Sequence, residues 1–178
     1  MTRIPACTVV ITLLIAATPA IAQVPTGPDV FAGYSPLRDL GTDDVPATDY
    51  TRGWVAAVGI PLPWWQLMAA GEVGMNQRTN IVDEAQQLFA ALGGVRMNVW
   101  RASRVALFAQ ALAGIERFSE PGFDESGPAI QPGGGVDIAI WSRLGARTQL
   151  DWRFSQQNGA SYQALRLAVG VVFRLGGD

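Results

Sequence analysis

Hydrophobic and polar residues alternate along most of this chain. In the last alternating run, Leu165, Val169 and Phe173 share one face with other apolar residues, while Arg166 and Arg174 lie on the opposite face. Only an extended strand separates residues in this way, because its side chains point alternately to opposite sides. The alternation therefore predicts a protein built from β-strands.

The pattern recurs often enough to define a fold class. Eight alternating runs can be distinguished, centred on residues 30–34, 54–60, 67–75, 89–99, 105–115, 136–140, 144–154 and 164–175. Eight strands of about ten residues match the smallest transmembrane barrels. We therefore expect an all-β fold, an eight-stranded antiparallel up-and-down transmembrane β-barrel.

Two stretches also allow a helical interpretation. Residues 53–71 carry no charge and are long enough to span a bilayer as a helix, but Pro61 and Pro63 favour a turn between two strands. In residues 80–92, Asn80 with Asp83 and Glu84 provides capping groups for a short helix. We expect a hairpin at the first stretch and leave a helical turn open at the second.

One face of the strands carries Leu, Val, Ile, Phe, Met and Trp, and the other mixes Gly and Ala with charged and amide side chains. In a membrane barrel the second face lines the lumen, where opposite charges neutralise one another. A slip of one residue in register places several arginines in lipid, at up to ~2–4 kcal/mol for each. The expected lumen charges are Glu72, Arg96, Glu116, Asp137, Arg147, Asp151, Arg153 and Arg166, with Arg174 as a further candidate.

Periodicity alone does not say which face is inside. A soluble, lipocalin-like barrel that binds a ligand shows the same alternation with its apolar face inward. Four tryptophans lie at the expected tight turns, where an aromatic girdle meets the membrane interface, and they favour the membrane arrangement. These tryptophans are Trp64, Trp65, Trp100 and Trp141.

The connections are expected to alternate in length. Short turns follow the even-numbered strands, and longer acidic loops span residues 37–49, 78–86 and 119–128. Short turns at one rim and longer loops at the other are typical of outer-membrane barrels.

Composition excludes several functions. The 178-residue chain has a net charge of −2 and no basic cluster, which argues against nucleic-acid binding. It contains no His, so Ser-His and Cys-His catalytic pairs are excluded. Asp43 and Asp44 lack the alternating spacing of a Ca²⁺ loop. We expect no cofactor, no metal site and no enzymatic activity.

The first residues form a targeting segment. Arg3 precedes an apolar stretch that ends in Ala20-Ile21-Ala22, which is typical of a cleaved secretory signal; an uncleaved anchor is the alternative. We expect a signal peptide over residues 1–22 and a barrel domain over residues 23–178. The single Cys7 lies in the signal, so the barrel has no disulfide.

The strands resemble those of the small outer-membrane β-barrel family, which includes the OmpA-like transmembrane domain and porin-like opacity-type surface proteins. The resemblance covers the chain after residue 22. It rests on VFAGYS at residues 30–35, GGGVD at 133–137, DWR at 151–153 and AVGVVFRL at 168–175. It implies that Gly170, Phe173 and Leu175 belong to a strand read by the barrel assembly machinery, although the chain continues to Asp178.

We therefore expect a monomeric, non-enzymatic integral protein of the outer membrane that contacts lipid and supports membrane integrity. Its acidic surface loops are expected to face a partner that the sequence does not identify. The alternatives are a narrow passive pore for small solutes and a soluble lipocalin-like ligand-binding barrel.

Overall fold

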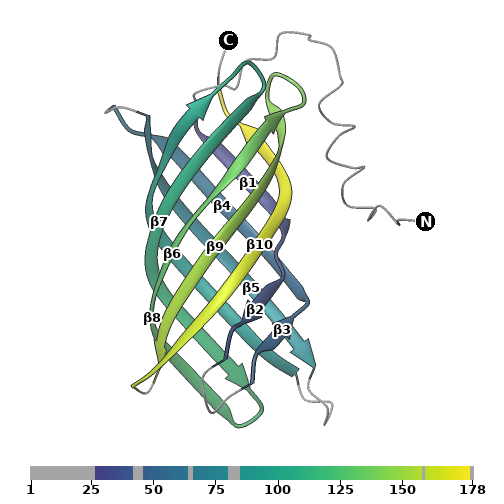
Figure 1. Cartoon of the computed structure of the whole chain (residues 1–178), viewed down its shortest axis with the longest axis vertical. Coiled ribbons are helices and arrows are strands. Elements are labelled where there is room, and N and C mark those ends of the chain that lie inside the picture. The colour runs from purple at the N-terminus through teal and green to yellow at the C-terminus, as the bar shows by residue number, and fades with distance from the viewer. Residues whose placement is uncertain (1–26, 42–45, 64–65, 80–84, 158, 177–178) are drawn as a thin grey trace, which may run out of the picture.

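The computed structural model describes residues 27–41, 46–63, 66–79, 85–157 and 159–176. Within these ranges the chain forms one sheet of ten antiparallel strands (Figure 1). In the described part of the chain, no helix has the length and apolar character needed to cross a membrane. The strands are β1 (Asp29–Tyr34), β2 (Leu37–Asp39), β3 (Thr48–Tyr50), β4 (Arg52–Pro61), β5 (Leu67–Thr79), β6 (Ala85–Arg101), β7 (Val105–Glu120), β8 (Phe123–Ala139), β9 (Leu144–Gln157) and β10 (Ala160–Arg174).

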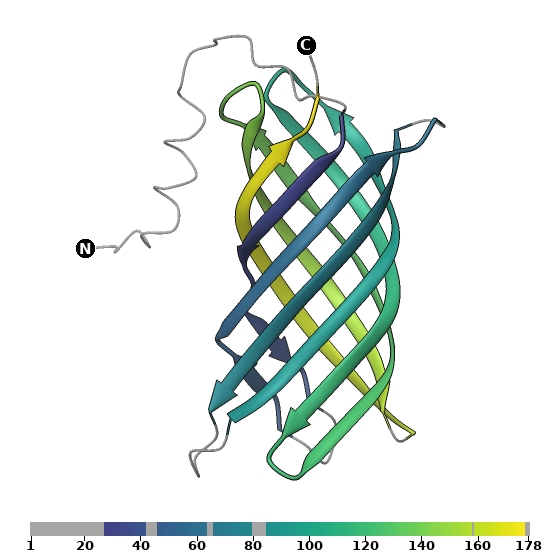
Figure 2. The ribbon, with the colours of Figure 1, turned by 180° about the vertical axis from the view of Figure 1, so that it is seen from behind.

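The sheet closes on itself into a barrel. β1 pairs with β4 on one side and with β10 on the other, so the first and last strands meet (Figures 1 and 2). β2 continues the path of β1 along β10, after an interruption at Pro36, which has no N–H to donate. β3 and β4 likewise follow one another along a single strand position of the barrel wall. The ten strands therefore fill eight wall positions, which confirms the predicted eight-stranded antiparallel barrel.

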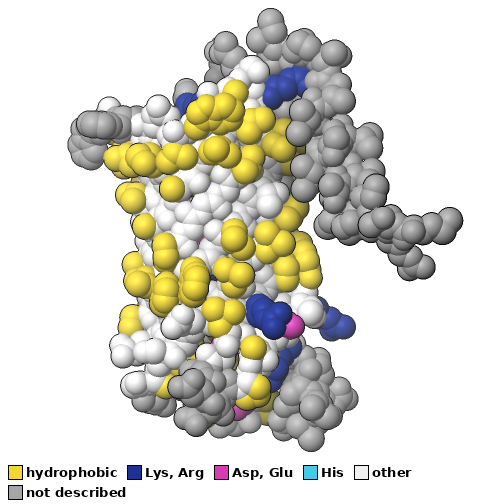
Figure 3. Space-filling model, viewed as in Figure 1, with side chains coloured by type: hydrophobic (Ala, Val, Ile, Leu, Met, Phe, Trp, Pro, Cys, Tyr) yellow, Lys and Arg dark blue, Asp and Glu magenta, His cyan; other side chains and the backbone are white. Residues whose placement is uncertain are grey.

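The two faces of the wall differ in chemistry, and the structure shows which one is inside. On β10, Leu167, Val169 and Val171 are exposed, whereas Arg166 and Arg174 are buried. Hydrophobic side chains cover much of the outer wall, and the visible charged ones lie towards its ends (Figure 3). The soluble, inside-out alternative is therefore wrong, because the apolar face points outwards.

The apolar outer face has the height of a bilayer core. On β6, the exposed side chains from Phe89 to Trp100 are apolar except where small residues intervene. At ~3.3 Å per residue and a tilt of about 40°, this segment rises roughly 28 Å. That height matches the ~25 Å apolar band of transmembrane barrels.

The connections differ at the two ends of the barrel. At the end where β1 begins and β10 finishes, which we call the turn end, three short connections join β4 to β5, β6 to β7 and β8 to β9 (Figure 1). The opposite end, which we call the hairpin end, carries the other connections. The proposed hairpin around Pro61 is confirmed, because β4 ends at that residue and pairs with β5.

Two of the expected acidic loops contain more strand than predicted. Residues 119–128 belong mostly to a continuous hairpin, in which β7 runs to Glu120 and β8 starts at Phe123. Gly122, with a φ of 81°, permits this tight turn. Within residues 37–49, β2 and β3 pair with each other. In both places, backbone pairing extends the wall through polar sequence that carries no alternating hydrophobic signal.

The sixth strand is longer than predicted, and the possible helix is largely absent. β8 spans Phe123–Ala139, whereas the alternating pattern predicts a strand only around residues 136–140. The pairing with β9 skips Pro132, whose ring nitrogen cannot donate. Leu88 and Leu92, which belong to the stretch that allows a helical turn, lie on β6. Residues 80–84 lie outside the described residues.

The barrel closes at a pair of glycines. Gly33 of β1 lies opposite Gly170 of β10. A Cβ atom on Gly170 would collide with the carbonyl oxygen of Ala32 and the Cα of Gly33. The two backbones can approach this closely only because neither residue has a side chain.

We predict that Gly170→Ala lowers the free energy of unfolding by about 1–3 kcal/mol, because the added methyl overpacks the seam. Gly93→Ala is the matched control, since its Cβ would lie 3.8 Å from the nearest atom, the Ala70 carbonyl oxygen. Urea titration of the refolded barrel in detergent measures both. Equal stability of the two variants would contradict a tightly closed seam.

Candidate functional site

The lumen of the barrel is filled by charged and amide side chains. All eight charged residues expected there have at most 5% of their surface exposed. They come from five strands, β5 to β9, together with Arg166 of β10. The buried set also includes Asp29, Asn76, Gln110, Gln131, Gln149 and Arg174.

The part of the lumen nearest the turn end is a cluster of arginines around two aspartates. Arg147 contacts Asp137 through Nε at 2.6 Å and Nη2 at 2.9 Å, and its Nη2 lies 3.3 Å from Asp29. Arg96 donates from Nη1 to both oxygens of Asp29, at 3.1 and 3.2 Å. Arg174 donates from Nη2 to Asp137 at 3.0 Å. Each carboxylate is therefore shared between two guanidinium groups.

Aromatic faces complete this cluster. The Arg147 guanidinium lies 5.2 Å from the Phe31 ring centre and 5.0 Å from that of Phe108. Arg96 lies 5.1 Å from the Phe108 ring centre. The negative faces of the two rings partly compensate the desolvation of these cations.

The middle of the lumen is filled by a second set of ion pairs. Arg166 places Nη2 2.7 Å from both Glu72 and Asp151. Arg153 donates to Glu116 at 2.9 Å. We call this set the central plug: Glu72, Glu116, Asp151, Arg153, Arg166 and the glutamines 110, 131 and 149.

The three glutamines link the ion pairs of the central plug. Gln131 donates to Glu72 at 2.9 Å and accepts from Arg153 at 2.8 Å. Gln149 donates to Glu72 at 3.1 Å and to Asp151 at 2.8 Å, and Gln110 donates to Asp151 at 2.9 Å. Buried carboxylates keep their charge only when their lone pairs are satisfied in this way.

The glycine run in β8 leaves space for these side chains. A Cβ atom on Gly133 would collide with the Asp151 carboxylate, and one on Gly135 would lie 2.7 Å from the Phe108 ring. The GGG sequence is therefore part of the lumen wall.

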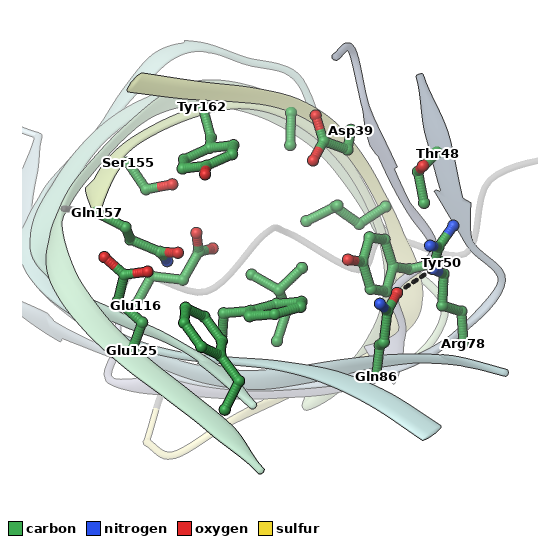
Figure 4. A pocket seen from close by; sticks show the side chains of 15 residues that line it. Asp39, Thr48, Tyr50, Arg78, Gln86, Glu116, Glu125, Ser155, Gln157 and Tyr162 are labelled. Atoms are coloured by element: carbon green, nitrogen blue, oxygen red, sulfur yellow. Dashed lines mark hydrogen bonds between the residues drawn. The ribbon is translucent and has the colours of Figure 1, made fainter. Parts of the chain in front are cut away.

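The plug separates two cavities. The cavity at the hairpin end has a volume of about 240 Å³ and is lined by aromatic side chains such as Tyr50 and Tyr162, together with Asp39, Arg78 and Glu125 (Figure 4). Arg78 donates to Gln86 across its edge. The cavity at the turn end has a volume of about 310 Å³ and is lined by the arginine cluster.

The charged side chains outside the lumen lie near the rims. At the hairpin end, Arg117 pairs with Asp124, and Arg38 lies 3.7 Å from Asp49. The hydrogen bonds from Arg117 hold the pKa of the exposed Asp124 carboxyl below its usual value. The expected acidic residues Asp43, Asp44, Asp83 and Glu84 lie outside the described residues.

The structure places the expected aromatic and assembly-strand residues on the outside. Trp100 and Trp141 are 51% and 65% exposed at the turn end. Trp64 and Trp65, like the signal segment, lie outside the described residues. Phe173 and Leu175 face outwards near the end of β10, whereas Gly170 lies at the seam.

A second group of outward aromatic residues lies inside the strands, away from the tight turns at which the aromatic girdle is predicted. Trp54 pairs with Tyr34 across β4 and β1. Trp152 stacks on Phe154 in β9 at 5.8 Å. These residues occupy the half of the wall nearer the hairpin end, so aromatic side chains mark both sides of the apolar band.

Asp29 is the main lumen residue that the sequence reading missed. It directly precedes the first alternating run and is in phase with Phe31, so extending the alternation by one residue would have found it. Among the described residues, no group of three or more His, Cys, Asp or Glu side chains is arranged to hold a metal ion.

Comparison with known proteins supports the fold. No protein-family model and no curated protein sequence matches the chain. Neisserial surface protein A (NspA) matches with a TM-score of 0.71 and 11% identity, over 84% of this chain and 97% of its own. Ail, the attachment invasion locus protein of Yersinia pestis, matches with a TM-score of 0.53 and 17% identity, over 83% and 99%.

At these identities the likeness concerns the fold. The neighbours are small outer-membrane β-barrels, and this chain shares their closed antiparallel wall over most of its length. The resemblance inferred from the strand sequences is thereby confirmed, and the chain has the fold of the small outer-membrane β-barrel family.

Proposed function

We propose that this protein is a non-enzymatic integral protein of the outer membrane, whose plugged barrel supports membrane integrity and displays charged hairpins at the cell surface. The observation that carries the proposal is the division of the wall into an apolar outer face and an ion-paired interior. Such a molecule is stable only where hydrocarbon surrounds it.

The central plug disfavours the narrow pore. Arg166 contacts carboxylates from β5 and β9, so it bridges the lumen from one wall to another. Arg153 joins β9 to β7 in the same region. An eight-stranded interior is only wide enough for its own side chains, and these ion pairs occupy it.

The chemistry of the lumen also disfavours catalysis. Each carboxylate of the central plug accepts hydrogen bonds from arginine or glutamine, which holds it as a structural anion. The chain has no His to serve as a general base near neutral pH.

The proposal includes the route to the membrane. Residues 1–22 act as a cleaved signal peptide, and β10 is the strand read by the barrel assembly machinery through Phe173 and Leu175. In support, both side chains are exposed on the outer wall. The turn end then faces the periplasm and the hairpin end faces the outside, as in barrels with short periplasmic turns.

Cell fractionation tests the membrane assignment. We expect the protein to stay with the outer membrane after washing with high salt and with sodium carbonate, and to require detergent for extraction. The extracted barrel should migrate faster on a gel without heating than after boiling. Release by carbonate, or a purified protein that stays monodisperse without detergent, would refute the assignment.

Loss of a plug or cluster charge should destabilise the barrel. Arg147→Ala leaves Asp137 without its closest partner, and Asp151→Ala removes a partner of Arg166. We expect each to lower the free energy of unfolding by about 1–3 kcal/mol, because the buried partners keep a second ion pair but lose hydrogen bonds that nothing else supplies. The temperature at which the folded gel band disappears measures the effect.

Arg143→Ala is the control for these two variants, because Arg143 is exposed in the turn between β8 and β9. Its expected change lies within about 0.5 kcal/mol. Unchanged heat resistance of both Arg147→Ala and Asp151→Ala would show that the paired interior does not stabilise the barrel.

A further inference from the structure

The cavity at the turn end carries an excess of positive charge. Its walls include two carboxylates, Asp29 and Asp137. The described residues that line it also include four arginines, Arg96, Arg101, Arg147 and Arg174. The hairpin-end cavity has the opposite balance, with Asp39, Glu116 and Glu125 against Arg78. The positive excess is therefore a property of one end of the lumen.

The carboxylates of the turn-end cavity are already engaged. Asp137 accepts from both Arg147 and Arg174, and Asp29 accepts from both Arg96 and Arg147. These ion pairs take up most of the acceptor capacity of the two carboxylates.

Three guanidinium nitrogens around the cavity remain without a hydrogen-bond partner among the described residues. They are Nη1 of Arg147, Nη1 of Arg174 and Nε of Arg101. Arg147 and Arg174 are 1% and 2% exposed. A buried N–H group on a cation is costly unless an acceptor satisfies it.

The space and the donors fit one class of ligand. A water molecule takes ~30 Å³ of liquid, so a cavity of about 310 Å³ has room for a small ion with part of its hydration shell. The planar, forked donors of arginine match the oxygens of phosphate, sulfate and carboxylate groups. Such an ion would neutralise the excess charge and accept from the three unpartnered nitrogens.

We propose that the turn-end cavity is a binding site for a small oxyanion of the inorganic phosphate type. The donors come from the turn-end parts of β6, β9 and β10, and the two aspartates hold Arg147 and Arg174 in place around the site. With the turn end towards the periplasm, the site is reached from that side and lies below the central plug. A lipid phosphate at the inner rim offers the same chemistry from a second source.

Calorimetric titration of the full-length mature barrel in dodecyl maltoside tests the proposal. Inorganic phosphate is titrated into protein in a chloride buffer of constant ionic strength. We expect one saturable site, with sulfate competing.

Arg101→Gln should weaken binding about tenfold, because it removes one hydrogen bond to a charged ligand. The ion pairs of Asp29 and Asp137 are made by Arg96, Arg147 and Arg174, so the change at Arg101 leaves them intact.

Arg143→Gln is the matched control, since this exposed arginine lies at the same end but does not line the cavity. It should bind phosphate as the unchanged protein does.

A short-chain phosphatidic acid in place of inorganic phosphate distinguishes the two sources of the phosphate group. Tighter binding of the lipid would overturn the assignment to a free ion.

Two other results would also overturn the proposal. One is the absence of saturable phosphate binding by the unchanged barrel, which would mean that water satisfies the three nitrogens. The other is an equal loss of binding in Arg101→Gln and Arg143→Gln, which would mean that phosphate responds only to the general charge of the rim.

Discussion

The requirement that every backbone N–H and C=O in hydrocarbon be paired within the protein determines this structure. A sheet meets it by closing, and here closure depends on β1, which pairs with β4 on one side and β10 on the other. The seam between β1 and β10 is only six residue pairs long and includes the facing pair Gly33 and Gly170. Residues 164–166 of β10 are paired by β2, which resumes the path of β1 after Pro36.

Closure of the barrel then determines which side chains point outwards and which point inwards. Once the wall is a cylinder, alternate residues face either lipid or a narrow interior, and a charged residue is tolerated only on the second face. Arg147 illustrates how the interior accommodates it: two aspartates and two aromatic rings surround one guanidinium group. Such pairing adds little net stability over an apolar core, but it makes each partner costly to remove. The ion network joins neighbouring strands, as in Arg147 with Asp137, and also strands far apart in the chain, as in Arg96 with Asp29.

The barrel fold could be predicted from the sequence because period-two alternation is strong wherever one face of a strand meets lipid. It placed Glu72, Arg96 and Arg166 on the lumen face from phase alone. It did not resolve which lumen charges meet, because contacts such as Arg96 with Asp29 join strands far apart in the chain and depend on barrel shear. The ends of the strands beyond the apolar band could not be predicted from the sequence either. In the hairpin of β7 and β8 most residues other than Phe118 and Phe123 are polar or small, so the strands continue where periodicity shows no alternation.

The central claim is that the apolar outer face meets acyl chains, and the fluorescence of Trp152 tests it most directly. Trp152 is 44% exposed on the outer wall, stacked on Phe154. A variant that keeps this tryptophan and replaces the other five by Phe is reconstituted into bilayers whose lipids carry bromine on the acyl chains. The account predicts strong quenching by the brominated lipids and little by aqueous iodide. Quenching by iodide with no effect of the brominated lipids would contradict it.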